Sequence, residues 1–189
     1  ERVATASGGV EYHADLPSSW SYLLPSGGVL LSLALRAMRE HLAAPELKVV
    51  SATATFCDPV PAGPLVITVT ALRRGGSAAQ LRAHLCARVA PGAPEAPYGL
   101  EVVATFARGR SGPEVQPATM PEVRPPSPHR PEGKPSRWPF IDQFQIDHVL
   151  GEASWLPAFK AGPAHQAFWY RYRAPVLAAA INRALAESG

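Results

Sequence analysis

The sequence has few cysteines, few charged residues and no long apolar run. Charged residues make up 17% of its 189 residues. The longest apolar stretch, residues 176–181, is far shorter than the ~20 residues that a helix needs to cross a bilayer. The first residues also lack the basic start and apolar core of a secretory signal. We therefore expect a cytoplasmic protein with no membrane partner.

The two cysteines, Cys57 and Cys86, both fall inside runs that predict strands. A disulfide between them is one alternative. We favour two buried free thiols, as expected in a reducing cytosol.

Several chemistries lack their sequence signatures. Eighteen Lys and Arg against fifteen Asp and Glu give a net charge of +3, and the basic residues are scattered, so no nucleic-acid partner is expected. There is no GxxxxGK[ST], HExxH, CxxC or GxSxG motif. The six histidines lack metal-ligand spacing. We expect neither a metal nor a cofactor.

Proline, by contrast, is abundant and unevenly placed. Nine of the 21 prolines lie between residues 113 and 139. Such a segment cannot form a helix or a central strand. We therefore predict an N-terminal domain at 1–110, a Pro-rich linker at 111–139 and a C-terminal unit at 140–189.

Hydrophobic patterning predicts the elements of both units. Residues 26–42 are apolar on almost every side, which predicts a mostly buried helix. Runs that are β-branched or alternate in polarity predict strands at 48–56, 65–73, 80–89 and 98–107. This order indicates an α+β fold in which an antiparallel sheet wraps the helix. The C-terminal unit repeats part of it, with strands expected at 140–149 and 166–173 and an apolar helix at 175–186.

The segment WSYLLPSGG, from Trp20 to Gly28, leads into the first of these helices. Adjacent Gly27 and Gly28 let backbone amides approach a ligand closely, and a helix N-terminus favours negative charge. A thioester carbonyl that becomes an oxyanion would suit such a site. The alternative is that both glycines serve packing against the strands. Trp20, Gly27 and Gly28 are the candidate substrate-binding residues.

Three stretches resemble the N-terminal half of the double-hotdog, acyl-CoA thioesterase II-like family. They read WSYLLPSGGVLLSLALRAM, SATATFCDPVPAGPLVITVTALRRGGSAAQLRAHL and VVATFAR. In that family a Gly-Gly pair opens the central helix and an F-x-x-P-V-x-x-G run ends a strand, here Phe56, Pro59, Val60 and Gly63. Residues 72–77 are a variant of its L-R-x-G-x-S turn. The resemblance implies a hotdog fold for residues 10–108 and a partial second hotdog from Phe140.

The resemblance also implies a catalytic Asp on the helix of the second hotdog, and Asn182 lies at that position. An Asn can hydrogen-bond a water but cannot accept its proton. Two functions therefore stay open: a thioesterase that hydrolyses fatty acyl thioesters, and a catalytically degenerate hotdog protein that binds acyl groups or has an assembly role. A hotdog hydratase or dehydratase is a weaker third, since no helix-borne His/Asp pair is visible.

The partners implied are acyl-CoA or an acyl-carrier thioester. A homo-oligomer is also expected, because hotdog sheets usually pair and an uncovered sheet edge needs a partner.

Overall fold

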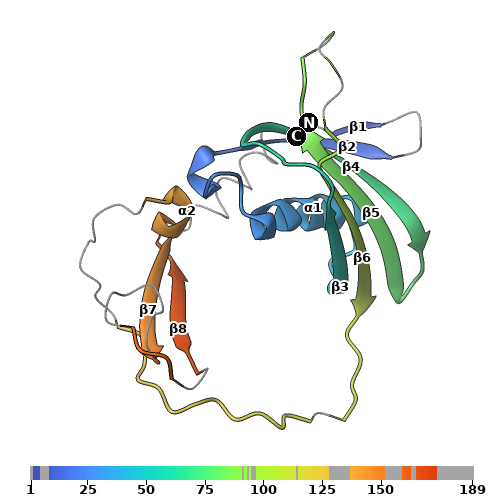
Figure 1. Cartoon of the computed structure of the whole chain (residues 1–189). Helices are drawn as coiled ribbons and strands as arrows, with labels where there is room; N and C mark the ends of the chain where they lie inside the picture. The colour runs from blue at the N-terminus through green and yellow to red at the C-terminus, as the bar shows by residue number, and fades with distance from the viewer. Residues whose placement is uncertain are drawn as a thin grey trace.

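The computed structural model describes residues 2–4, 9–90, 92, 94, 97–113, 115–127, 137–151, 159–162 and 165–173. A long helix lies inside the curve of one sheet, and a small hairpin lies apart from it (Figure 1). In chain order the elements are β1 (Arg2–Ala4), β2 (Val10–Leu16), η1 (Ser18–Trp20), α1 (Gly27–Leu42), β3 (Leu47–Phe56), β4 (Gly63–Arg74), β5 (Ala78–Ala87), β6 (Leu100–Arg108), α2 (Pro139–Asp142), β7 (Phe144–Leu150) and β8 (Ala167–Tyr172).

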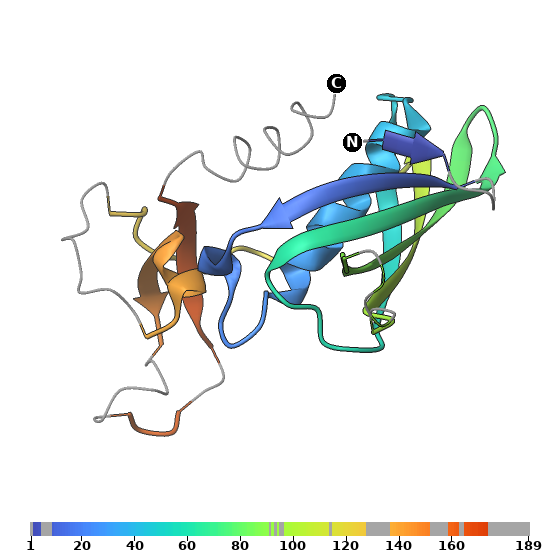
Figure 2. The ribbon, with the colours of Figure 1, turned by 90° about the horizontal axis from the view of Figure 1, so that it is seen from above.

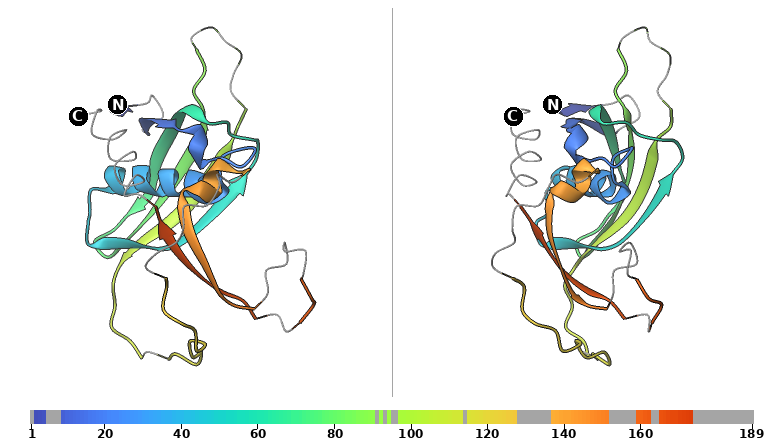
Figure 3. Two further views of the ribbon diagram at one scale, coloured as in Figure 1. Left: turned by 90° about the vertical axis from the view of Figure 1, so that its left-hand side faces the viewer. Right: turned by 60° about the vertical axis from the view of Figure 1, so that its left-hand side comes forward.

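The larger sheet has six antiparallel strands in the order β1-β2-β4-β5-β6-β3. It curves around α1, which contacts β4, β5 and β6 (Figure 3). This arrangement confirms the α+β fold that the patterning predicts, with the sheet wrapped about the helix.

Helix α1 forms because its apolar residues cover the face that meets the sheet. Ala34, Ala37 and Met38 are almost completely buried. On its solvent side Arg36 pairs with Glu40 at 3.0 Å. Arg74 at the end of β4 donates a 2.8 Å hydrogen bond to the carbonyl of His41 and so satisfies an acceptor in the last turn.

The central strands alternate between core and solvent, as their sequences predict. Residue pairs on neighbouring strands stack into layers: Ile67 faces Leu85, which faces Leu100. The inward-facing, fully buried side chains of these strands are Leu65, Ile67, Val69, Ala79, Leu81, Ala83, Leu85, Leu100, Val102, Ala104 and Phe106. Together with α1 they form the hydrophobic core.

Several features differ from the expectations. Residues 10–16 form β2, which the patterning did not predict and which extends the sheet by pairing with β4. The strand expected at 140–149 starts later, at Phe144, because Pro139 begins the short helix α2. The two cysteines form no disulfide, as expected, but Cys57 is exposed and Cys86 only partly buried, so the expectation of two buried thiols was wrong.

The C-terminal hairpin β7–β8 forms a separate two-stranded antiparallel sheet. Figure 2 shows from above that α2 lies beside η1. This contact joins the hairpin to the N-terminal part of the chain. The helix expected at 175–186, including Asn182, lies outside the described residues. None of the helices in the described ranges is long and apolar enough to span a membrane.

Candidate functional site

A pocket of about 500 Å³ opens at the N-terminus of α1. One wall is the loop before the helix with the first turn, and the other is the end of β3 with the turn that follows. The lining residues are Leu24, Pro25, Gly27, Leu30, Phe56, Cys57, Asp58, Pro59 and Val60. The lining is mostly apolar, and the volume lies within the ~300–1,000 Å³ usual for small-molecule sites.

The amides of Gly27 and Gly28, at the start of α1, are two hydrogen-bond donors beside this pocket. The amides of Val29 and Leu30 donate to the carbonyl of Ser26, at 2.9 and 3.2 Å. Within the described part of the chain, the amides of Gly27 and Gly28 have no acceptor, and no acidic side chain lies in the first turn. Free amides and the helix dipole together favour an oxygen that carries negative charge.

The two glycines lie in different surroundings. A Cβ on Gly27 would lie 2.8 Å from the Cζ atom of Phe56, so the aromatic ring packs where a side chain would start. A Cβ on Gly28 would meet nothing closer than the Ser26 hydroxyl at 3.8 Å. The packing alternative therefore accounts for Gly27, whereas packing does not require Gly28.

The turn after β3 is held by its backbone. The amides of Cys57 and Asp58 both donate to the carbonyl of Gly99, at 2.8 and 3.0 Å, and the amide of Tyr98 donates to the Asp58 carboxylate at 2.9 Å. Gly99 has a φ of +78°, and a Cβ there would lie 2.3 Å from the Leu85 carbonyl. Only glycine fits at this position, so this wall of the pocket is firmly placed.

Trp20 is almost completely buried but does not line the pocket. Its ring makes edge contacts with Phe140, Phe144 and Tyr172, with centroids 6.2–6.3 Å apart. Its carbonyl accepts a 3.2 Å hydrogen bond from the amide of Ser26, the residue that precedes α1. Trp20 thus connects the C-terminal hairpin with the residues that open the helix.

The loop from Ser21 to Pro25 is held on the same side. The amide of Phe140 donates to the Ser21 carbonyl at 3.1 Å, and the Phe140 ring lies 4.6 Å from that of Tyr22. Burial, with a smaller contribution from Tyr170, raises the pKa of the Tyr22 phenol. Leu24, at the far end of this loop, belongs to the pocket wall.

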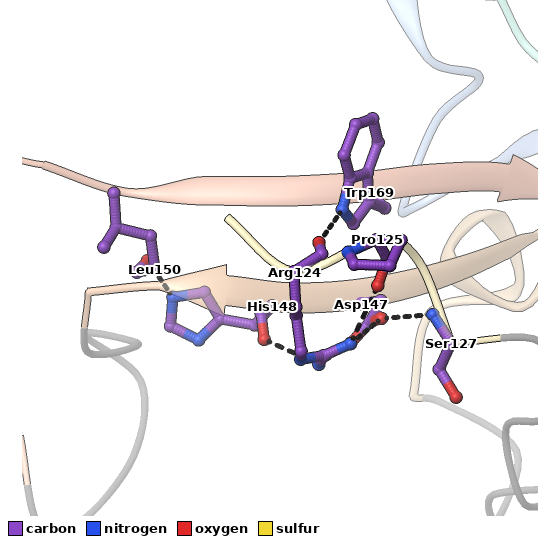
Figure 4. Close-up of polar contacts among 7 residues, drawn as sticks. All are labelled: Arg124, Pro125, Ser127, Asp147, His148, Leu150 and Trp169. Carbon is purple, nitrogen blue, oxygen red and sulfur yellow. Dashed lines mark hydrogen bonds and ion pairs between the residues drawn. The ribbon is translucent and has the colours of Figure 1, made fainter. Parts of the chain in front are cut away.

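A polar cluster fastens part of the Pro-rich segment to the hairpin (Figure 4). The Arg124 guanidinium makes two hydrogen bonds to Asp147, at 2.7 and 2.6 Å, which raise the pKa of Arg124. The Arg124 carbonyl accepts a 3.0 Å bond from the Trp169 indole, and the Ser127 amide donates to Asp147 at 2.9 Å. The cluster positions the hairpin and belongs to neither wall of the pocket.

The structure brings only some of the candidate residues together. Gly27 lines the pocket, Gly28 is its neighbour on α1, Trp20 lies under the aromatic rings, and Asn182 is outside the described residues. Leu24 and Phe56 are wall residues that were not among the candidates from the sequence. Phe56 had a signal: it begins the F-x-x-P-V-x-x-G run, which ends the strand facing the twin glycines.

A comparison with protein families matches residues 16–109 to the acyl-CoA thioesterase N-terminal domain. Residues 16–109 of this chain belong to that domain family. The matched residues contain the whole pocket and helix α1, so the candidate site lies inside the thioesterase-family domain. The family resemblance inferred from the sequence is confirmed.

Solved structures show the same hotdog fold. They include a hotdog-fold protein of unknown function from Alicyclobacillus acidocaldarius (20% identity, TM-score 0.59, covering 79% of this chain and 54% of that one). Others are a putative thioesterase from Novosphingobium aromaticivorans (18%, 0.55, 78% and 58%) and the acyl-CoA thioesterase II TesB2 from Mycobacterium marinum (20%, 0.51, 98% and 66%). The chain thus spans between about half and two thirds of these chains. A comparison with curated proteins found no match.

Proposed function

We propose that the chain is an acyl-CoA thioesterase-like protein that binds a fatty acyl thioester at the N-terminus of α1. The apolar pocket would hold the acyl chain, and the amides of Gly27 and Gly28 would receive the thioester carbonyl oxygen. One observation carries the proposal: a largely apolar pocket opens beside two free helix amides inside a thioesterase-family domain.

These residues supply binding and oxyanion stabilisation. In hydrolysis, the oxygen of water bonds to the carbonyl carbon while the C–S bond breaks, which gives a carboxylic acid and a free thiol. Negative charge builds on the carbonyl oxygen meanwhile, and amides placed for it lower the barrier. Trp20 contributes by holding the loop that carries Leu24 and by fixing the start of the helix.

The alternative is a catalytically degenerate hotdog protein that binds acyl groups without hydrolysing them. Asn182 favours it, because an Asn at the position of the family's Asp cannot take a proton from water. Both functions use the same pocket and take acyl-CoA or an acyl-carrier thioester. We propose fatty acyl metabolism in the cytoplasm as the setting.

Adjacent leucines provide a matched test of the pocket. Leu24 lines it, whereas Leu23 does not and is 85% exposed. We expect Leu24→Asp to weaken binding of a non-hydrolysable acyl-CoA thioether at least tenfold, because a carboxylate would enter an apolar wall. Leu23→Asp should bind as the wild type does. Titration calorimetry measures both, and equal affinities in the two variants would contradict the proposal.

Release of free thiol separates the two functions. Wild-type protein that binds acyl-CoA and releases thiol is a thioesterase, and protein that binds without release is the degenerate form. If the protein is active, Asn182→Ala should reduce thiol release. An unchanged rate would refute the assignment of Asn182 to the catalytic position.

We also propose that the chain forms a homo-oligomer through strand β3. This strand is an outer edge of the six-stranded sheet and is ten residues long. It carries one charged residue, Lys48, and its Val49 and Val50 are exposed. A long, nearly uncharged edge strand is a template for pairing with another strand, and a second copy offers one of matching composition.

A further inference from the structure

Phe56 is a large apolar side chain that is 55% exposed at the edge of the pocket. It is the last residue of β3, where its backbone is paired with Leu100 of β6. The next amide, that of Cys57, is bonded to the Gly99 carbonyl. The backbone of Phe56 is therefore fixed on both sides, while much of its ring faces solvent.

The ring packs against the backbone at the start of the helix, and Phe56 is more than half exposed. Its Cζ and Cε1 atoms lie 2.8 and 3.1 Å from where a Gly27 side chain would begin. A fully buried aromatic ring is locked by neighbours on all sides, whereas Phe56 is 55% exposed and lines an open pocket. A change of side-chain rotamer would enlarge or reduce the pocket without disturbing β3.

We propose that Phe56 is a specificity-determining residue whose ring limits the length and bulk of the acyl group that the pocket accepts. This inference rests on the proposed function, and it assigns the limit to one side chain. The pocket volume of about 500 Å³ is roughly three times the ~150 Å³ cavity that holds a benzene molecule. At that size the volume of one aromatic wall residue is a large share of the space available.

The test compares affinities for a series of non-hydrolysable acyl-CoA thioethers, from butanoyl to palmitoyl length, measured by titration calorimetry. We expect Phe56→Ala to improve affinity for the longest chain relative to the shortest by about tenfold, because one or a few added methylenes in an apolar pocket change affinity by that order. Phe56→Trp should shift the preference toward short chains, and it keeps the test open if Phe56→Ala fails to fold.

Val50 supplies the matched control. It lies on the same edge strand, is 62% exposed and does not line the pocket. Val50→Ala should keep the wild-type preference for chain length. Gly27→Ala provides a second control, because its added methyl group would press on the Phe56 ring. It should change the preference for chain length in the wild-type background. The change should be smaller in the Phe56→Ala background, where the ring is gone.

The outcomes distinguish a failure of this inference from a failure of the proposed function. If the wild type binds acyl-CoA analogues and the Phe56 variants keep its preference, the inference is overturned and the proposed function stands. If the wild type binds none of them, both are overturned. If Phe56→Ala changes the oligomeric state in light scattering and leaves the preference unchanged, Phe56 is a contact between copies and the inference is again overturned.

Discussion

Two neighbouring glycines at the start of α1 show how differently one residue type is used. Gly27 has the ring of Phe56 against its missing side chain, whereas Gly28 has open space to 3.8 Å. Neither amide has an acceptor among the described residues, and Gly27 lines the pocket. Gly27 is therefore required because the Phe56 ring fills the space of a side chain, whereas a side chain at Gly28 would meet no such obstacle.

This difference predicts that the same substitution affects stability differently at the two positions. Gly28→Ala should raise the free energy of unfolding by about 0.5–1 kcal/mol, because alanine loses less conformational entropy in a helix. Gly27→Ala should gain less or destabilise, since its Cβ must displace the Phe56 ring. Urea denaturation monitored by circular dichroism measures both. Equal gains in the two variants would contradict the contact.

The sequence identified the glycines at this site but not the ring that meets one of them. Apolar periodicity and a Gly-Gly pair are local signals, so the helix start was predictable. The Phe56 contact depends on how β3 pairs with β6 and how the sheet curves over α1, which no local pattern encodes. The burial of Trp20 is equally absent from any local pattern, because its ring contacts Phe140, Phe144 and Tyr172, more than a hundred positions further along the chain.

Among the elements, most of those with strong periodicity were predicted. Helix α1 and strands β3 to β6 follow from apolar runs of clear period. Strand β2 is the exception: its seven residues alternate strictly between apolar and polar, which is the pattern of a half-buried strand, and it was nevertheless missed. Helix α2 is a single turn set by Pro139, too short for any periodic signal.

The C-terminal hairpin depends on a polar contact that fastens the Pro-rich segment to it. Arg124 makes two short hydrogen bonds to Asp147 of β7, and its carbonyl accepts from Trp169 of β8. Paired hydrogen bonds of this kind fix orientation as well as distance. These bonds hold residues 124–127 of the Pro-rich segment against the hairpin.

Loss of this contact should expose the segment to proteolysis. Asp147→Asn removes the charge that holds Arg124 and Ser127, so we expect cleavage by a nonspecific protease within residues 115–127 to become faster. Glu122→Gln, a change of the same kind on an exposed side chain in the same segment, should leave the cleavage rate unchanged. Mass spectrometry of the fragments locates the cut. Equal rates in wild type and Asp147→Asn would show that other contacts hold the segment.

For the whole molecule, the decisive surface is the outer edge of β3. Natural sheets usually protect such an edge with charges, prolines or a bulge. Here the strand has an irregularity near Val49, one lysine and no proline over ten residues. The lysine and the irregularity both lie in the first half of the strand. Residues 52–56 carry neither protection, and this part of the edge favours association with a second copy.

A charge near the middle of that edge should block the association. Thr53→Lys would bring two lysines close together in a symmetric antiparallel pair, and like charges facing each other are unfavourable. Val103→Lys is the control, because Val103 is the cross-strand neighbour of Thr53 but lies on the interior strand β6. Light scattering should show smaller particles for Thr53→Lys only. A wild-type protein that is monomeric throughout would contradict the oligomer.

The double hydrogen bond to the Gly99 carbonyl has a consequence for how this family can diversify. One wall of the site is attached to the sheet by main-chain atoms, at a residue that cannot bear a side chain. The position of this wall therefore does not depend on which side chains line it. Successive substitutions at Leu24, Phe56 or Pro59 could retune ligand choice during divergence while the architecture persists.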